Sequence, residues 1–271
     1  MCDEHDHGDS HNELGAAKHV RSTDPAPIRL AVTGKGGVGK TTIASALAHR
    51  LASDGSVVAI DADPDMNLAG ALGVPEPPAI TAERELIGDR IGDGGLIRLT
   101  PEIEDVLDSH SKPFGDGGRL LTIGAPTGGD TGCMCSENAF IRSILSSSLA
   151  DGNVVMDMEA GIEHLGRGTA ADMDAILVVV EPSRAAINTA NRITHLAADL
   201  GIDDVFAVVN KSRGELDRVI DHLDAPVLTE LPSDEAIARA GLTGEATFDA
   251  SDSLREAADE ILATLRQPVA V

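Results

Sequence analysis

The chain has 271 residues, of which 42% are hydrophobic, enough to build the core of one sizeable domain. Its formal net charge of −24 argues against nucleic acid or an anionic membrane as a partner, because no Lys/Arg cluster interrupts the acidic composition. Only five of the 21 basic residues are lysine, a bias typical of halophilic proteins, with an ordinary acidic cytosolic enzyme as the alternative.

Two further absences in the sequence predict a cytoplasmic protein. No apolar run reaches the roughly 18 residues that a membrane-spanning helix needs, and the polar, acidic start does not read as a signal peptide. Three cysteines cannot build a disulfide framework, so we expect reduced thiols that are free to bind metal.

Residues 1–27 are predicted to form a disordered acidic tail, because they are polar and poor in apolar side chains. The tail contains Cys2 and four histidines, residue types that bind transition metals loosely, although a solvated tail with incidental histidines is the alternative. Residues 28–271 are predicted to form a single domain.

The stretch that organises this domain is a phosphate-binding loop. A strand at 28–32 and a helix at 41–51 flank a match to the pattern G-x-x-x-x-G-K-[ST]. Glycines let several backbone N–H groups point inward at an anion, and the helix adds its positive N-terminal dipole. We expect Lys40 to reach the β- and γ-phosphates of ATP and Thr41 to complete a Mg²⁺ shell. The nucleotide-binding residues predicted here are Gly34, Lys35, Gly36, Gly37, Val38, Gly39, Lys40, Thr41 and Thr42.

Lys35 gives this loop a second lysine, directly after the first glycine. The loop resembles the deviant phosphate loop of the MinD/ParA/nitrogenase-iron-protein class of ATPases. That resemblance implies a nucleotide-sandwich homodimer in which Lys35 reaches the partner's phosphates and acts in catalysis. A solvated lysine on an exposed loop is the alternative.

The next predicted strand, 56–60, ends at two carboxylates beside the phosphate site. The position resembles switch I of the same class, which implies that Asp63 orients the attacking water and that Asp61 lies close to the magnesium shell. A strand-end turn before Pro64 is the alternative. Asn67 is expected to cap the short helix that follows.

Residues 74–118 read as an insertion with two amphipathic helical stretches, 81–91 and 101–110. We assign no chemistry to it and expect a helical surface layer that meets a partner.

A strand at 119–123 leads into a glycine-rich loop that contains Cys133 and Cys135, just before a helix that Ser136 is expected to cap. A helix N-terminus lowers the pKa of a thiol and favours the thiolate. Two thiolates half-coordinate a nickel or zinc ion, and a two-fold dimer would present four sulfurs. Two idle cysteines are the alternative.

The strand 154–157 ends in Asp157, in the arrangement of a Walker B motif. We expect Asp157 to hold Mg²⁺ through water. The Gly161 N–H is expected to sense the γ-phosphate, since glycine allows close backbone approach.

The segments 132–145 and 157–169, with the loop, switch I and C-x-C motifs in this order, resemble the carbon monoxide dehydrogenase nickel-accessory ATPases (CooC). The resemblance covers about residues 28–266 and implies a client metalloenzyme as a partner. The Cys/His tail and the strongly acidic surface depart from that family.

The last third of the chain supplies the predicted adenine contacts. The class resemblance assigns Asn210, after a strand at 205–209, to the adenine edge, together with Lys211; a turn residue is the alternative. The segment 231–234, after a strand at 225–231, resembles a second adenine-flanking segment, which implies contacts from Leu231 and Pro232. Alternating strands and helices predict an α/β fold, a doubly wound and mostly parallel sheet with helices on both faces.

The sequence is compatible with three functions. The first is an ATPase whose dimer delivers nickel or zinc to a client enzyme. The second is a MinD- or ParA-like regulator, which predicts a basic amphipathic terminal helix, whereas the helix at 251–266 is acidic. The third is an iron–sulfur redox ATPase like the nitrogenase iron protein, although both cysteines here lie in one loop.

Overall fold

The structure is a computed structural model that describes residues 26–91, 104–124, 143, 152–160 and 173–267. In these residues eight strands form one sheet, in the order β3-β4-β2-β5-β1-β6-β7-β8. Strand β3 is antiparallel to β4, and every other neighbouring pair is parallel. The strands are β1 (Arg29–Thr33), β2 (Val57–Asp61), β3 (Lys112–Phe114), β4 (Gly118–Thr122), β5 (Asn153–Asp157), β6 (Ala175–Val180), β7 (Val205–Ser212) and β8 (Val227–Pro232).

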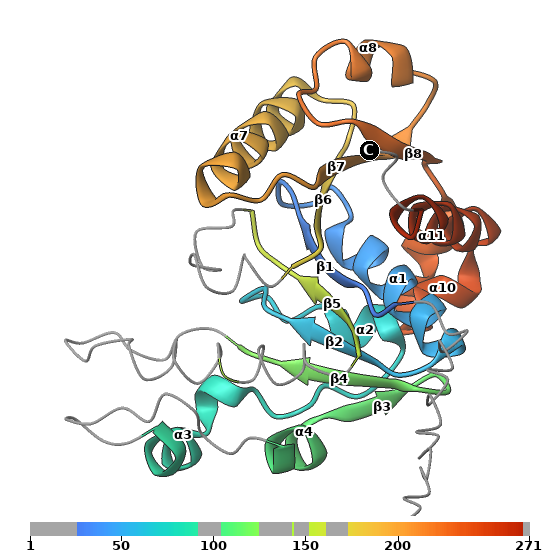
Figure 1. The fold of residues 1–271 in the computed structure, drawn as a ribbon. Coiled ribbons are helices and arrows are strands. Elements are labelled where there is room, and N and C mark those ends of the chain that lie inside the picture. Colours follow the sequence, from blue (N-terminus) through green and yellow to red (C-terminus); the bar gives the residue numbers. More distant parts are fainter. Residues whose placement is uncertain (1–25, 92–103, 125–142, 144–151, 161–172, 268–271) are drawn as a thin grey trace, which may run out of the picture.

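Helices cover both faces of this sheet, as the sequence predicted (Figure 1). Helices α1, α10 and α11 lie on one face, and α7 lies on the other beside β6 and β7. No helix in the described ranges is both long and apolar enough to cross a bilayer. The helices are α1 (Lys40–Asp54), α2 (Leu68–Leu72), the 3-10 turn η1 (Ile80–Ala82), α3 (Arg84–Ile91), α4 (Glu104–His110), α7 (Arg184–Leu200), α8 (Leu216–Ile220), α9 (Glu235–Thr243), α10 (Thr247–Ala250) and α11 (Asp252–Leu265).

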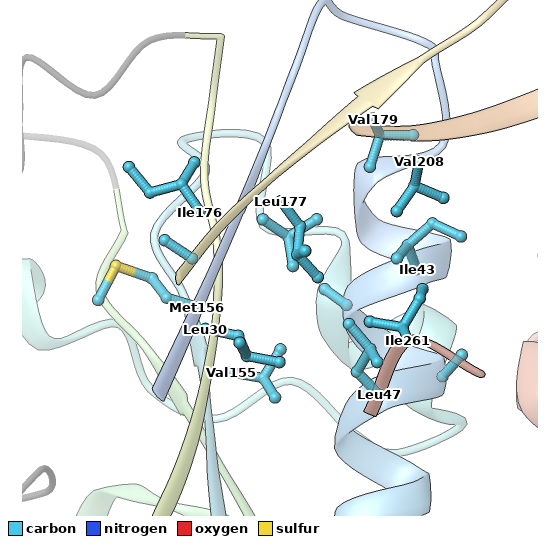
Figure 2. Close-up of a cluster of buried hydrophobic side chains, with 14 of the residues drawn as sticks. Leu30, Ile43, Leu47, Val155, Met156, Ile176, Leu177, Val179, Val208 and Ile261 are labelled. Carbon is cyan, nitrogen blue, oxygen red and sulfur yellow. The ribbon is translucent and has the colours of Figure 1, made fainter. Parts of the chain in front are cut away.

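The central strands are apolar along their whole length because both of their faces are covered. All six residues of β6 are buried. Its side chains alternate between the two faces (Figure 2). Leu177 and Val179 point toward Ile43 and Leu47 of α1, whereas Ile176 points to the opposite face, as Met156 of β5 does.

The elements η1, α3 and α4 form a small hydrophobic cluster apart from the main core. Their buried side chains Ile80, Ile87 and Val106 pack on Leu121 of β4. The sequence predicted the two helices, α3 and α4, but not the edge strand β3, which is only three residues long and contains a proline. Phe114 of β3 packs so closely on the next strand that a Cβ at Gly118 would lie 2.4 Å from its ring.

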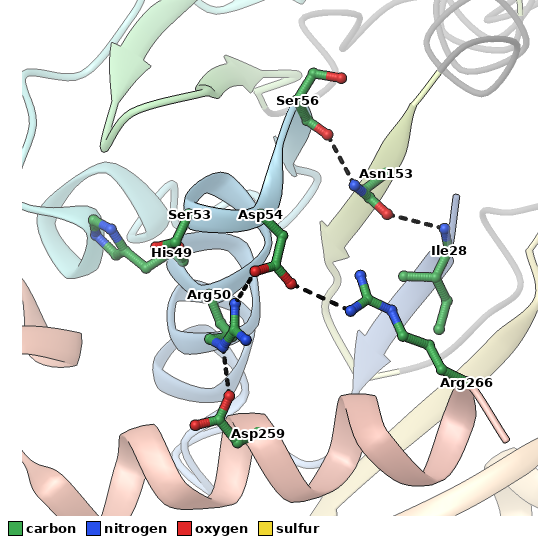
Figure 3. A network of polar contacts seen from close by, with 9 residues as sticks. All are labelled: Ile28, His49, Arg50, Ser53, Asp54, Ser56, Asn153, Asp259 and Arg266. Atoms are coloured by element: carbon green, nitrogen blue, oxygen red, sulfur yellow. Dashed lines mark hydrogen bonds and ion pairs between the residues drawn. The ribbon is translucent and has the colours of Figure 1, made fainter. Parts of the chain in front are cut away.

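Two polar networks lie near the amino ends of the central strands (Figure 3). The Asn153 side chain at the start of β5 accepts the N–H of Ile28 at 3.1 Å and donates to the carbonyl of Ser56 at 2.9 Å. It thereby joins the chain segments that enter β1 and β2. Beside it, Arg50 of α1 pairs with Asp54 and with Asp259 of α11, but these pairs are partly exposed and contribute little to stability.

We expect Asn153→Ala to lower the free energy of unfolding by about 0.5–1.5 kcal/mol, because the partly buried N–H of Ile28 and the carbonyl of Ser56 lose their partner. Urea unfolding measures this loss. The matched control is Asn188→Ala on the exposed face of α7, where alanine favours the helix and no loss is expected. Equal midpoints for wild type and Asn153→Ala would show that this side chain does not hold the strands.

Candidate functional site

The phosphate loop follows β1, near the centre of the sheet. Strand β1 lies between β5 and β6, so the chain order along the sheet reverses at this point, and a crevice opens outside the carboxyl ends of the strands. Helix α1 begins at Lys40, directly after the loop. The N–H groups of its first turn have no intrahelical acceptor and therefore favour an anion.

The backbone of the loop explains its glycines. Gly37 and Gly39 have φ values of 81° and 100°, in the left-handed region that side chains disfavour. A Cβ on Gly34 would lie 2.4 Å from the carbonyl oxygen of Val179, and one on Gly39 would lie 2.2 Å from Nδ2 of Asn210. The loop thus requires glycine both for its curl and for its close contact with β6 and β7.

Two lysines of the loop differ in their environment. Lys40 is buried, and its Nζ lies 3.6 Å from Oδ2 of Asp63, so two of the three predicted catalytic residues, Lys35, Lys40 and Asp63, are in contact. Lys35 is partly exposed at the start of the loop. Its predicted reach toward a second protomer stays a prediction, because the structure holds one chain.

Asp61 and Asp157 stand side by side in register at the ends of β2 and β5, and both are fully buried. Oδ1 of Asp61 accepts the N–H of Asp63 at 3.2 Å, and Oδ2 accepts the N–H of Leu68 at 2.9 Å. Asp61 therefore shapes the turn after β2, which was predicted to be switch I, and caps the first turn of α2. Asn67 stands at the N-cap of α2, but its side chain makes no capping bond, contrary to the expectation.

Burial dominates the electrostatics of this pair. It raises the pKa of Asp157 to about 7, an effect that the nearby Thr41 hydroxyl and Lys40 partly offset. Burial raises the pKa of Asp61 to about 6, while its two backbone hydrogen bonds pull the value down. Charge repulsion raises both values further: Asp61 and Asp63 act on the pKa of Asp157, and Asp63 and Glu76 act on the pKa of Asp61.

The donor set fits Mg²⁺. Neither carboxylate oxygen of Asp157 has a hydrogen-bond partner among the described residues, an expensive arrangement for a buried acid. The hydroxyl of Thr41 lies beside it. Mg²⁺ commonly takes one or two protein oxygens together with water and substrate phosphates, which matches one hydroxyl and one carboxylate. Asp61 has both of its oxygens engaged and fits the prediction of a magnesium ligand less well.

A cavity of about 570 Å³ opens over the loop, large enough for a nucleotide. It brings together most of the predicted loop residues with Asp63, Asn210, Lys211 and Pro232. Leu231 is not part of its lining in the described chain, because its side chain is buried in the core. Ser233 and Asp234 of the predicted adenine-flanking segment also line the cavity. Sequence reasoning missed several lining residues in the turn after β2, after β5 and in α9: Asp65, Asn67, Glu159, Ala160, Ile237, Ala238 and Gly241.

Several other predicted residues lie outside the described residues. They are Cys133 and Cys135, the phosphate sensor Gly161, and Cys2 with the tail histidines. Within the described ranges, no group of three or more His, Cys, Asp or Glu side chains is arranged to hold a metal ion.

Comparison with known proteins agrees with this geometry. Residues 30–248 match the CobQ/CobB/MinD/ParA nucleotide binding domain. The chain belongs to this family. It is an ATPase of the CobQ/CobB/MinD/ParA type, as the loop, the cavity and the ATP-binding relatives agree.

Relatives of this family match nearly the whole chain. The carbon monoxide dehydrogenase accessory protein CooC of Rhodospirillum rubrum is 37% identical over 257 residues, which cover 89% of this chain and 97% of the relative. An uncharacterized ATP-binding protein of Methanocaldococcus jannaschii is 36% identical and covers 80% of this chain and 90% of its own length.

Solved structures share the fold at lower identity. A ParA family ATPase from Chlorobium tepidum superposes with a TM-score of 0.67 at 19% identity, covering 88% of this chain and 98% of that one. The MinD protein of Pyrococcus horikoshii, solved with Mg-ADP, superposes with a TM-score of 0.61 at 19% identity, covering 90% and 99%.

The raised pKa of Asp157 predicts a pH dependence of stability. Because the folded chain keeps this proton to about pH 7 and the unfolded chain loses it near 3.8, the free energy of unfolding falls as the pH rises through that window. Without nucleotide or Mg²⁺, Asp157→Asn should therefore gain thermal stability over wild type as the pH rises. Unfolding midpoints at pH 5 and pH 8 measure it, and a difference that does not grow with pH would contradict the assignment.

Proposed function

We propose that this chain is an Mg-ATP-dependent, dimerising ATPase that assists insertion of metal, nickel above all, into a metalloenzyme such as carbon monoxide dehydrogenase. The observation that carries the proposal is the similarity to the accessory protein CooC, which spans 97% of that relative at 37% identity. A match over the whole length covers the segments between the shared phosphate motifs, where members of one fold differ in function.

Hydrolysis is proposed to use residues that already converge on the cavity. Lys40 and the loop N–H groups bind the β- and γ-phosphates, and Thr41 with Asp157 would hold Mg²⁺, which neutralises phosphate charge. Asp63 accepts a hydrogen bond from the water that attacks the γ-phosphorus. In the absence of phosphate Asp63 is paired with Lys40, so an incoming phosphate competes for Lys40 and releases the Asp63 carboxylate toward water.

The base is proposed to bind at the other end of the cavity. The Asn210 amide keeps one N–H and one lone pair beyond the bonds that it makes, enough to meet the donor and acceptor of an adenine edge. Pro232, Ile237 and Ala238 supply apolar surface at this end. Lys35 is proposed to contact the phosphates bound by a second protomer.

The metal is the cargo of this cycle. Cys133 and Cys135 are proposed to bind it as thiolates, two from each protomer, in a closed site that the dimer shares. Hydrolysis would release the switch segments and change the geometry of that site, so that ATP controls metal transfer.

The second candidate is a MinD-like regulator, which the solved structures favour through the shared fold. One feature of the structure argues against membrane targeting by the terminal helix. The apolar side of α11, with Leu254, Ile261 and Leu262, is buried against α1 and β8 and is not free to enter a lipid surface. The net charge of −24 opposes binding to DNA.

Lys35→Ala tests the proposed dimer. We expect it to bind ATP about as well as wild type but to lose at least about a hundredfold in turnover, because a positive charge supplied in trans contributes mainly to the transition state. Its mass in Mg-ATP should be that of a monomer where wild type is a dimer. Lys112→Ala, on the exposed edge strand β3, controls for the lost charge. Full turnover by Lys35→Ala would place Lys35 on a passive surface.

Metal content tests the proposed cargo. After limiting nickel or zinc, we expect about one metal ion per dimer, lost in Cys133→Ala/Cys135→Ala and kept in the matched control Cys2→Ala. An ATP-driven dimer whose metal content ignores the double substitution would contradict metal delivery. A brown, iron-containing protein from anaerobic purification would favour the iron–sulfur alternative.

A further inference from the structure

The end of β7 holds the phosphate loop through two side chains that are adjacent in sequence. Nδ2 of Asn210 donates to the carbonyl oxygen of Val38 at 2.8 Å. Nζ of Lys211 donates to the carbonyl oxygen of Gly37 at 2.6 Å. Strand β7 and the loop thus meet through consecutive carbonyls of the loop and consecutive residues of the strand.

The backbone of Lys211 is strained in order to make this contact. Its φ is 58°, and Met66 is the only other non-glycine residue with positive φ in the described chain. A left-handed lysine persists only where its surroundings stabilise it, and such strain is concentrated at functional positions. Here Oδ1 of Asn210 accepts the N–H of Lys211 at 2.9 Å, which fixes the turn that brings the ammonium back over the loop.

The contact of Lys211 with Gly37 fixes the direction in which a peptide group of the phosphate loop points. A phosphate loop binds anions only while its N–H groups face the ligand and its carbonyls face elsewhere. Gly37 and Lys211 both line the cavity, so a Gly37 carbonyl that turned inward would repel phosphate. The ammonium of Lys211 binds that oxygen and opposes the flip, to which a glycine peptide is especially prone.

We propose that Lys211 is a positioning residue that holds the phosphate loop in its anion-binding conformation before nucleotide arrives. Its contribution is to binding of the polyphosphate and not to recognition of the base. The proposal needs only the nucleotide binding of this family and is independent of the metal cargo and the client enzyme.

The deciding experiment compares three ligands by calorimetry in the presence of Mg²⁺: ATP, GTP and inorganic tripolyphosphate. Lys211→Met removes the ammonium and keeps the length of the side chain. We expect all three ligands to bind roughly tenfold more weakly, by a similar factor, because a hydrogen bond from a charged donor is lost. Lys112→Met, with the same change of charge on the far edge strand β3, should leave all three affinities unchanged.

Two outcomes overturn the proposal. A loss for the nucleotides with unchanged tripolyphosphate binding would make Lys211 a base contact. An equal loss in Lys112→Met would reduce its role to net charge in an acidic protein.

A second measurement separates positioning from general damage to the fold. Lys211→Gly removes the contact but suits the left-handed backbone, so its thermal midpoint without ligand should match that of wild type. We still expect its KM for ATP to rise about tenfold at a nearly unchanged kcat, and the amide protons of the loop to exchange faster with solvent. A lowered kcat at an unchanged KM, or unchanged exchange in the loop, would contradict a positioning role.

Discussion

The structure depends on burying two carboxylates and one ammonium together at the ends of central strands. Asp61, Asp157 and Lys40 occupy a low-dielectric layer, where isolated charges are costly. Each group is stabilised differently. Asp61 accepts hydrogen bonds from two backbone N–H groups, and Lys40 forms an ion pair with Asp63. The pKa of Asp157 is raised, which favours its neutral form. Neither oxygen of the Asp157 carboxyl has a hydrogen-bond partner among the described residues, and a divalent cation with phosphate would stabilise its ionised form. The buried charges of this layer therefore favour the binding of Mg²⁺ together with a nucleotide.

The sequence predicted what local patterns encode. The strand before the glycine loop, the helix after it and the helices α3 and α4 each depend on neighbours in the chain, and the structure confirms them. The sequence could not show contacts between segments that are distant along the chain. The bonds of Asn210 and Lys211 to the loop span more than 170 residues, and the capping of α2 by Asp61 replaced the local expectation for Asn67. Strand β3 was missed because three residues with a proline carry no periodic signal.

The same sheet supports different functions in this family, so the shared site and the distinguishing segments must be considered separately. The loop, Asp63 and the residues after β5 line one cavity. The solved ParA family ATPase and the MinD protein with Mg-ADP share the fold. What distinguishes members is attached to it. Here the terminal helix α11 is packed onto the core, and the acidic surface disfavours anionic partners. The proposed output therefore passes through the C-x-C loop that follows β4 and not through a membrane or DNA contact.

The central claim is that the glycine loop and Lys40 form a site for Mg-nucleotide. Calorimetric titration of Mg-ATP into wild type and Lys40→Ala tests it most directly, with thermal unfolding to show that the variant is folded. The account predicts one ATP per chain for wild type and no measurable binding for the variant, because Lys40 is the buried cation of the phosphate site. Equal affinity in the two proteins would contradict the account and move the nucleotide site elsewhere.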